Sequence, residues 1–174
     1  MTKRAHRRVV AVSGAMLFLA AMSVAAVAGP GDKAGWSVDT DLRKRAFLKY
    51  VPAGQGPRLL VVGCLRDVDS IVILSQHEPG AVPPDVPVTL TLVNGAAKYA
   101  VQGKSEANGV GVGERGFVSE FDADANKRAE LQQKLLPVLE GKGAIAITVG
   151  AWSRNLPVSG LADVIGRFKA VCFR

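Results

Sequence analysis

The chain has 174 residues, of which 48% are apolar and 21% charged, and its formal net charge is +7. This apolar content excludes a mostly disordered chain. The first 28 residues contain four basic and no acidic side chains, so the remaining 146 carry 18 basic against 15 acidic residues, a balance of only +3. The basicity therefore belongs largely to the amino-terminal segment. This distribution argues against a nucleic-acid-binding protein.

Residues 1–28 have the pattern of a secretory signal peptide. A positive start precedes an apolar stretch over 9–27, and Ala26-Val27-Ala28 forms a small-x-small cleavage site. The basic residues of the start are Lys3, Arg4, Arg7 and Arg8. The alternative is a retained anchor, because about 19 apolar residues can just cross a bilayer. We expect cleavage near Ala28, a periplasmic or secreted protein without a membrane span, and a single β-rich domain over 29–174.

Two cysteines, Cys64 and Cys172, follow this leader, and an even count in an exported chain predicts a disulfide. The loop between them would contain 107 residues. In the chain-entropy description a loop of this size contributes about 4–5 kcal/mol of stability. Two separate buried thiols or one catalytic thiol are the alternatives. A cysteine nucleophile needs a base, and His77 is the one histidine after the leader.

Alternating and wholly apolar runs predict strands in the first half of this domain. Residues 43–51 alternate, with Ala46, Leu48 and Tyr50 on one side. The runs 59–65 and 71–74 are apolar throughout, which is typical of strands buried on both faces.

A hairpin and several further strands follow. Asn94-Gly95 separates two alternating runs, 88–93 and 97–101, and favours a hairpin with a type I′ turn. The glycine-rich segment 103–116 is left without an assignment. Additional strands are expected at 117–121, 145–149 and 152–156.

Two segments have helical periodicity. In the first, about 123–139, Asp122 or Asp124 can cap the helix, and Pro137 should end or kink it. In the second, about 160–172, Ser159 is the expected N-cap. The apolar residues of the second helix share one side and are Leu161, Val164, Ile165, Phe168, Val171 and Cys172. The predicted fold class is α+β, a mostly antiparallel sheet or sandwich with both helices packed on it and one disulfide.

No motif predicts a cofactor, a metal or a catalytic residue. The G-x-G-x-x-G pattern over 111–116 lacks the preceding strand and following helix of a dinucleotide site. The acidic run 122–126 resembles the start of a calcium loop, but Lys127 and Gln133 stand where that loop needs Gly and Glu. His77 is expected at the surface, and Trp36 and Trp152 in the core or at its edge.

One basic segment is a candidate binding surface. The predicted strand Arg43–Tyr50 contains two aromatic residues, Phe47 and Tyr50. Four cations surround them in the sequence: Arg43, Lys44, Arg45 and Lys49. Such a strand can meet an anionic envelope ligand, for example a polysaccharide or lipid headgroups. A solvated strand surface is the commoner outcome.

Short motifs at the two ends resemble small exported proteobacterial proteins of the type VI secretion-associated periplasmic family and the invasion-associated locus B family. They comprise Trp36, the run from Pro57 to Cys64, the run from Leu156 to Leu161, and Cys172. The segment 103–121 matches neither pattern. The resemblance implies fold and compartment, and neither family brings a catalytic residue to these positions.

Three functions follow as hypotheses. The first is a periplasmic, non-enzymatic accessory or interaction protein of the cell envelope with an unidentified protein partner. The second is a binding module for an anionic envelope ligand through Arg43–Tyr50. The third is an enzyme with an unrecognised site.

Overall fold

The computed structural model describes residues 34–41, 44–54, 56–77, 82–106 and 116–173. These residues form one nine-stranded sheet with helices on it, which confirms the α+β prediction and the mostly antiparallel sheet. The order across the sheet is β1-β2-β3-β4-β7-β6-β5-β8-β9, and all neighbours are antiparallel. The strands are β1 (Gly35–Asp41), β2 (Arg45–Val51), β3 (Leu60–Leu65), β4 (Ser70–Gln76), β5 (Pro87–Asn94), β6 (Ala97–Glu106), β7 (Gly116–Asp122), β8 (Ile145–Val149) and β9 (Trp152–Leu156).

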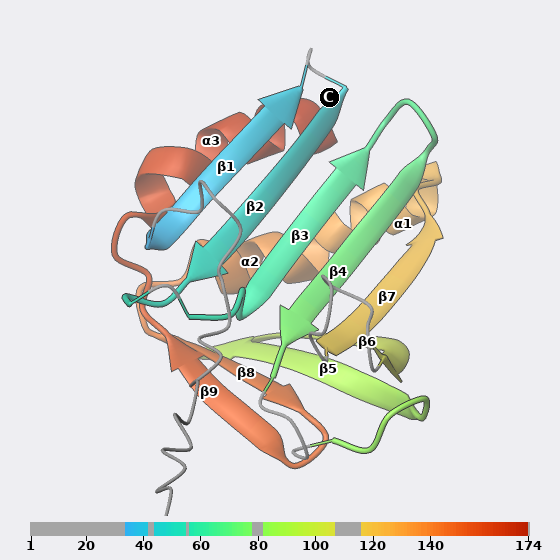
Figure 1. Ribbon diagram of the computed structural model, residues 1–174. Coiled ribbons are helices and arrows are strands. Elements are labelled where there is room, and N and C mark those ends of the chain that lie inside the picture. Colours follow the sequence, from blue (N-terminus) through green and yellow to red (C-terminus); the bar gives the residue numbers. More distant parts are fainter. Residues whose placement is uncertain (1–33, 42–43, 55, 78–81, 107–115, 174) are drawn as a thin grey trace, which may run out of the picture.

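The sheet is strongly bent. Strands β1 to β4 and β7 run side by side, whereas β5, β8 and β9 cross below them (Figure 1). The first and last strands approach each other at one end, where the indole Nε1–H of Trp36 on β1 donates to the carbonyl of Pro157, just after β9, at 2.6 Å. We call the gap between β9 and the facing ends of β2, β3 and β4 the seam.

The helices cover one face of this sheet (Figure 1). They are α1 (Ala125–Glu130), the π-helical turn η1 (Leu131–Leu135), α2 (Leu136–Leu139) and α3 (Leu161–Cys172). Helix α3 packs on β1 and β2, and α2 packs on β5 and β6. The apolar side predicted for α3 is buried, with Ile165 only partly so, and it joins the sheet's inner side chains in one core.

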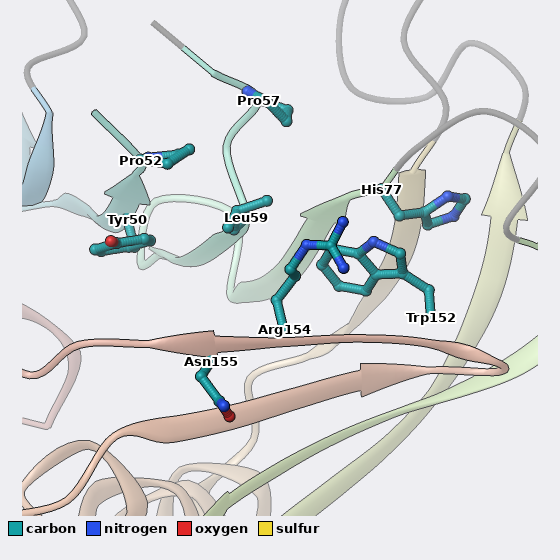
Figure 2. Close-up of a pocket in the computed structure, with 8 residues that line it drawn as sticks. All are labelled: Tyr50, Pro52, Pro57, Leu59, His77, Trp152, Arg154 and Asn155. Carbon is teal, nitrogen blue, oxygen red and sulfur yellow. The ribbon is translucent and has the colours of Figure 1, made fainter. Parts of the chain in front are cut away.

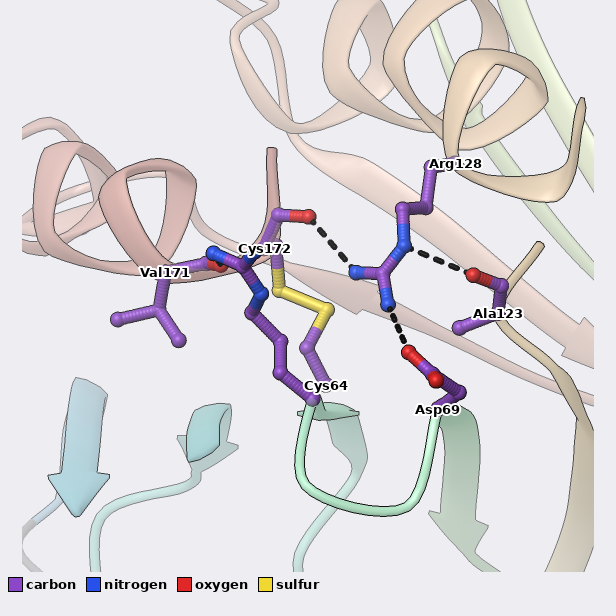
Figure 3. A network of polar contacts seen from close by, with 7 residues as sticks. Cys64, Asp69, Ala123, Arg128, Val171 and Cys172 are labelled. Atoms are coloured by element: carbon purple, nitrogen blue, oxygen red, sulfur yellow. Dashed lines mark hydrogen bonds and ion pairs between the residues drawn. A yellow bond between two sulfur atoms is a disulfide. The ribbon is translucent and has the colours of Figure 1, made fainter. Parts of the chain in front are cut away.

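The predicted disulfide is present between Cys64 on β3 and Cys172 at the end of α3, with a Cα–Cα distance of 5.6 Å. Both residues are at most 1% exposed. Two arginines reach the last carbonyls of α3 beside it. Arg128 donates to the Cys172 carbonyl at 3.2 Å (Figure 3). Nη1 of Arg66 lies 3.5 Å from the Val171 carbonyl. These carbonyls have no partner within a helix, and a cation near them is favourable.

Arg128 also connects α3 to two other parts of the chain. Its Nε–H donates to the Ala123 carbonyl at 2.8 Å, and its Nη2 donates to the Asp69 carboxylate at 3.1 Å (Figure 3). The β3–β4 turn, the start of α1 and the end of α3 are therefore held together next to the buried disulfide.

The hairpin between β5 and β6 forms, but its turn lies one residue later than the sequence predicts. Asn94 pairs with Ala97, so the turn residues are Gly95 and Ala96, and only Gly95 has a positive φ, 60°. Asn94 is buried instead: its amide donates to the Val138 carbonyl at 3.0 Å, and its oxygen accepts from the Gly143 N–H at 3.1 Å. These tertiary hydrogen bonds outweigh the local preference for an Asn-Gly turn.

The first helix does not end at Pro137. Asp124 caps it as predicted, accepting from the Lys127 N–H at 2.7 Å, and the helical chain continues to Leu139. In the π-turn η1 the Leu136 N–H bonds to the Leu131 carbonyl, five residues back. A proline ring would clash with the carbonyl four residues earlier in a regular α-helix. The wider π-helical turn before Pro137 avoids this clash, so the helix continues past the proline.

The predicted cap of the last helix is wrong. The N-cap is Gly160, with φ 80°, and no side chain bonds to the first turn. Ser159 precedes it and takes no part in capping. Glycine adopts this left-handed conformation without a steric penalty. The conformation of Gly160, and not a capping side chain, therefore sets the direction in which α3 begins.

We expect Cys172→Ala to lower the free energy of unfolding by about 2–5 kcal/mol, as the loss of native disulfides does in exported domains. Urea unfolding followed by circular dichroism measures the change. The double variant Cys64→Ala/Cys172→Ala is the control and should lose about as much. Equal urea midpoints for Cys172→Ala and the parent protein would contradict a stabilising bond.

We expect Asn94→Ala to destabilise the fold by roughly 1–3 kcal/mol, because it leaves the buried Val138 carbonyl without its hydrogen-bond donor. The Gly143 N–H also loses its acceptor, but Gly143 is exposed and water can replace that bond. Gln102→Ala is the matched control, because its amide bonds the Thr89 hydroxyl at an exposed position, and its effect should stay within about 0.5 kcal/mol. Thermal melting distinguishes them, and equal losses would show that Asn94 does not bridge α2 and the loop before β8.

Candidate functional site

A pocket of about 330 Å³ lies in the seam (Figure 2). Its lining comes from segments far apart in the chain: the end of β2 and the following loop, the residue before β3, the residue after β4, and β9. The lining residues are Tyr50, Pro52, Pro57, Leu59, His77, Trp152, Arg154 and Asn155. Ligand-sized pockets in proteins have about 300–1,000 Å³. This pocket is at the lower end of that range.

The walls of the pocket are mainly apolar and aromatic, with a few polar groups. Two prolines and Leu59 lie opposite the Trp152 indole, and the Arg154 guanidinium stands 5.7 Å from the indole centre (Figure 2). Among the described lining residues there is one guanidinium and no carboxylate. Flat rings, prolines, an amide and a guanidinium are groups that bind a ligand by contact and hydrogen bonding.

His77 is buried at one end of this pocket, which corrects the prediction of a surface histidine. It is 4% exposed, and its ring lies 6.2 Å from the Trp152 ring. Trp152 itself is 5% exposed, in agreement with the expected core position. A sheet that bends back on itself brings these two rings together, although 74 residues separate them in the sequence.

The Trp152 indole carries an unusual donor. Its Nε1–H is buried and has no acceptor within the residues that the structure describes. A buried polar group without a partner costs free energy. Figure 2 shows the nitrogen edge of the ring turned away from the β9 backbone, on the side where Leu59 and His77 lie. A ligand acceptor reaching this part of the pocket would relieve that cost.

Of the basic segment predicted over Arg43–Tyr50, the described cations do not line this pocket, although Tyr50 at its end does. Arg43 is outside the described residues, and Lys44 is exposed in the turn before β2. Arg45 forms two hydrogen bonds from its Nε–H to the Asp67 carboxylate, at 2.8 and 3.0 Å, and an ion pair through Nη2. Lys49 pairs with Asp39 on β1. The structure thus balances two of these charges locally, and anionic-ligand binding by this strand stays a prediction.

The ion pair of Arg45 has an electrostatic consequence. The hydrogen bonds from the Arg45 guanidinium hold the pKa of the Asp67 carboxyl below its ordinary value, and the carboxylate raises the pKa of Arg45. Both groups are solvent-accessible, so salt screens much of their attraction.

The remaining sequence motifs can be placed only in part. The G-x-G-x-x-G pattern lies outside the described residues except for Gly116, which begins β7. The acidic run 122–126 forms the end of β7 and the capped start of α1. In the described ranges no three His, Cys, Asp or Glu side chains gather in a metal-binding arrangement. Over the same ranges, no helix has the length and apolarity to cross a membrane.

The fold and pocket define an α+β protein with a bent antiparallel sheet, a buried disulfide and a seam pocket. No protein-family model matches the chain. No curated protein matches it. Among solved structures, the crystal structure of invasion associated protein B from Bartonella henselae is similar, at 14% identity over 80% of this chain and 96% of that chain, with a TM-score of 0.43.

The printed name of that structure is that of the invasion-associated family, one of the two families whose motifs the sequence resembles. The type VI secretion-associated family receives no support from the comparisons.

We expect Arg45→Gln to raise the pKa of Asp67 toward its ordinary value. Because the folded-state pKa is the lower one, the contribution of this pair to stability is present above the unfolded pKa and is lost as the pH falls through the folded pKa. Carboxyl carbon NMR of Asp67 across acidic pH measures the shift. Lys49→Gln is the control, since it removes a cation that pairs with Asp39. An unchanged Asp67 titration in Arg45→Gln would contradict the ion pair.

Proposed function

We propose that this protein is exported to the cell envelope and acts there as an accessory protein that binds a partner, without catalysing a reaction. The observation that carries the proposal is the Cys64–Cys172 disulfide. Disulfides form and persist in oxidising compartments, such as the periplasm and the extracellular medium, and are rare in the reducing cytosol.

The leader pattern over 1–28 supports the same compartment independently. Its positive start, apolar stretch and small-residue site are the features that direct a chain to export. Without these residues the charge is nearly balanced, as expected for a protein whose task is specific recognition and not general attraction to polyanions.

The seam pocket supports binding as the mode of action. Its groups make contacts and hydrogen bonds, and they lie where the two ends of the sheet approach each other. A site built between separate strands is positioned by the whole sheet, which keeps its geometry rigid. Export and binding together describe an accessory protein of the envelope.

The test is to express the full chain in a Gram-negative host and to fractionate the cells. We expect the protein in the periplasm, at the mass of residues 29–174, with no thiol that iodoacetamide alkylates until a reductant is added. A variant lacking residues 2–28 is the control and should stay in the cytoplasm with both thiols reactive. Full-length protein in the cytoplasm with two reactive thiols would overturn the proposal.

A further inference from the structure

One wall of the seam pocket is fixed by its own hydrogen bonds and packing. The Leu59 N–H donates to the Tyr50 carbonyl at 3.1 Å, and the Leu59 carbonyl accepts from the Ser75 hydroxyl at 2.8 Å. In the loop between β2 and β3, Gly56 lies so close to Pro52 that an added Cβ would stand 2.6 Å from the proline ring. These contacts keep the apolar side of the pocket in one arrangement, as in most pockets that bind small molecules.

The opposite wall is the indole of Trp152, at the start of β9. Val149 and Trp152 pair where the β8–β9 hairpin turns, and Gly150 in that turn has a φ of 56°. Residues with a side chain rarely adopt this conformation, so the glycine turn sets where β9 and its indole begin. Figure 2 shows the nitrogen edge of the ring on the side where two further lining residues, Leu59 and His77, lie. The indole donor therefore faces the pocket.

The Trp152 Nε1–H is a polar group for which the described chain provides no acceptor. Its residue is more than nine-tenths buried. The other indole differs, because the Nε1–H of Trp36 donates to the Pro157 carbonyl at 2.6 Å. Buried donors in native proteins are almost always paired, so an exception calls for an explanation. An acceptor that comes from a bound molecule is such an explanation.

The charges of the lining favour an uncharged ligand. A cation would find no carboxylate among the described lining residues. The Arg154 guanidinium has partners of its own: it donates to the Ser153 carbonyl at 3.1 Å and stands 5.7 Å from the centre of the Trp152 ring. A charge that enters an apolar site without a counter-ion loses its hydration and gains little in return.

The size of the pocket favours a small molecule. One water takes about 30 Å³ of the liquid, so a cavity of about 330 Å³ has room for on the order of ten waters. The three residues that contribute rings, Tyr50, His77 and Trp152, are at most 9% exposed. What these rings offer therefore lies inside the seam, where a compact molecule fits and a folded partner could not spread over it. An apolar ligand gains affinity by displacing water that apolar walls hold weakly.

We propose that the seam pocket binds a small, uncharged and mainly apolar molecule, whose carbonyl oxygen accepts a hydrogen bond from the Trp152 Nε1–H. The proposal rests on the proposed binding function and names the class of molecule that the pocket takes. The apolar body of the ligand lies between the indole and the opposite wall of Pro52, Pro57 and Leu59. Because the Nε1–H is buried from water, the side chains around it shift as the ligand enters.

The experiment compares acetophenone with α-methylstyrene, a probe of the same shape in which a CH₂ group replaces the carbonyl oxygen. Each is titrated into isotope-labelled, disulfide-bonded protein, and the indole Nε1–H signals of Trp36 and Trp152 are followed by NMR. We expect acetophenone to move the Trp152 signal downfield, because a new hydrogen bond deshields the proton. The Trp36 signal should stay, since its donor already has an acceptor. Binding should saturate at roughly millimolar probe, and acetophenone should bind about fivefold or more tightly than α-methylstyrene.

Trp152→Phe tests the donor directly. The variant keeps an aromatic wall but has no ring N–H, so acetophenone should lose its advantage and the two probes should bind within about twofold of each other. The indole signal that disappears from the spectrum also identifies which of the two signals belongs to Trp152.

Two exposed prolines keep the test decisive if Trp152→Phe does not fold. Pro57 lines the pocket, whereas Pro83 lies before β5 and outside the lining. Pro57→Ala should weaken the binding of both probes about threefold or more, because apolar contact with the ligand is lost. Pro83→Ala is the matched control and should leave both affinities unchanged, and melting curves verify that both variants are folded.

Three results would each overturn the inference. The first is a Trp152 signal that acetophenone does not move. The second is equal affinity of the parent protein for acetophenone and α-methylstyrene. The third is a Pro57→Ala variant that binds both probes as the parent does.

The outcomes separate this inference from the proposed function. A protein that reaches the periplasm with its disulfide but shows no Trp152 shift overturns the inference alone. A protein that binds acetophenone in the seam but stays in the cytoplasm overturns the proposed compartment and leaves the pocket site in place.

Discussion

The covalent bond between β3 and the end of α3 is the constraint on which the arrangement depends. It fixes the last helix against the half of the sheet that holds β1 to β4 and β7. Because Pro157, between β9 and α3, also accepts the Trp36 indole, the path of the chain from β9 into α3 is held at both ends. Strand β9 is held on its other side by its ladder with β8, so these two connections and that ladder together fix its place across the seam.

At the seam, the edge strand β9 faces the ends of β2, β3 and β4 without joining their hydrogen-bond ladders. Sheets with exposed edges are liable to pair with other chains, and proteins protect such edges with short strands, charges or covering elements. Here β9 is five residues long and carries Arg154, so both protections are present, and the Trp36–Pro157 contact limits the gap at one end.

Local patterns in the sequence were sufficient for most elements but not for the site. The alternation at Ala46, Leu48 and Tyr50 predicts β2 correctly, because burial on one face repeats every second residue. The helical spacing around Cys172 predicts its inward direction and hence the disulfide. These features depend on periods that a short window contains.

Features set by distant partners escaped prediction. Asn94 has the best local turn pattern in the chain, yet its amide bonds to Val138 and Gly143 and so shifts the turn by one residue. His77 is polar and stands beside prolines, and only the bend that brings Trp152 next to it explains its burial. The order of the strands, with β7 between β4 and β6, is likewise not indicated by any local sequence pattern.

The separation of the two cysteines has a consequence for the timing of maturation. Cys64 precedes Cys172 by 108 residues, so in a chain that crosses a membrane from its amino end the first thiol arrives long before its partner. During that interval Cys64 has no second cysteine of its own chain to pair with, so oxidation can join it only to thiols of other molecules as a mixed disulfide. In a chain exported in this direction the disulfide would therefore form late, only after the last helix has crossed.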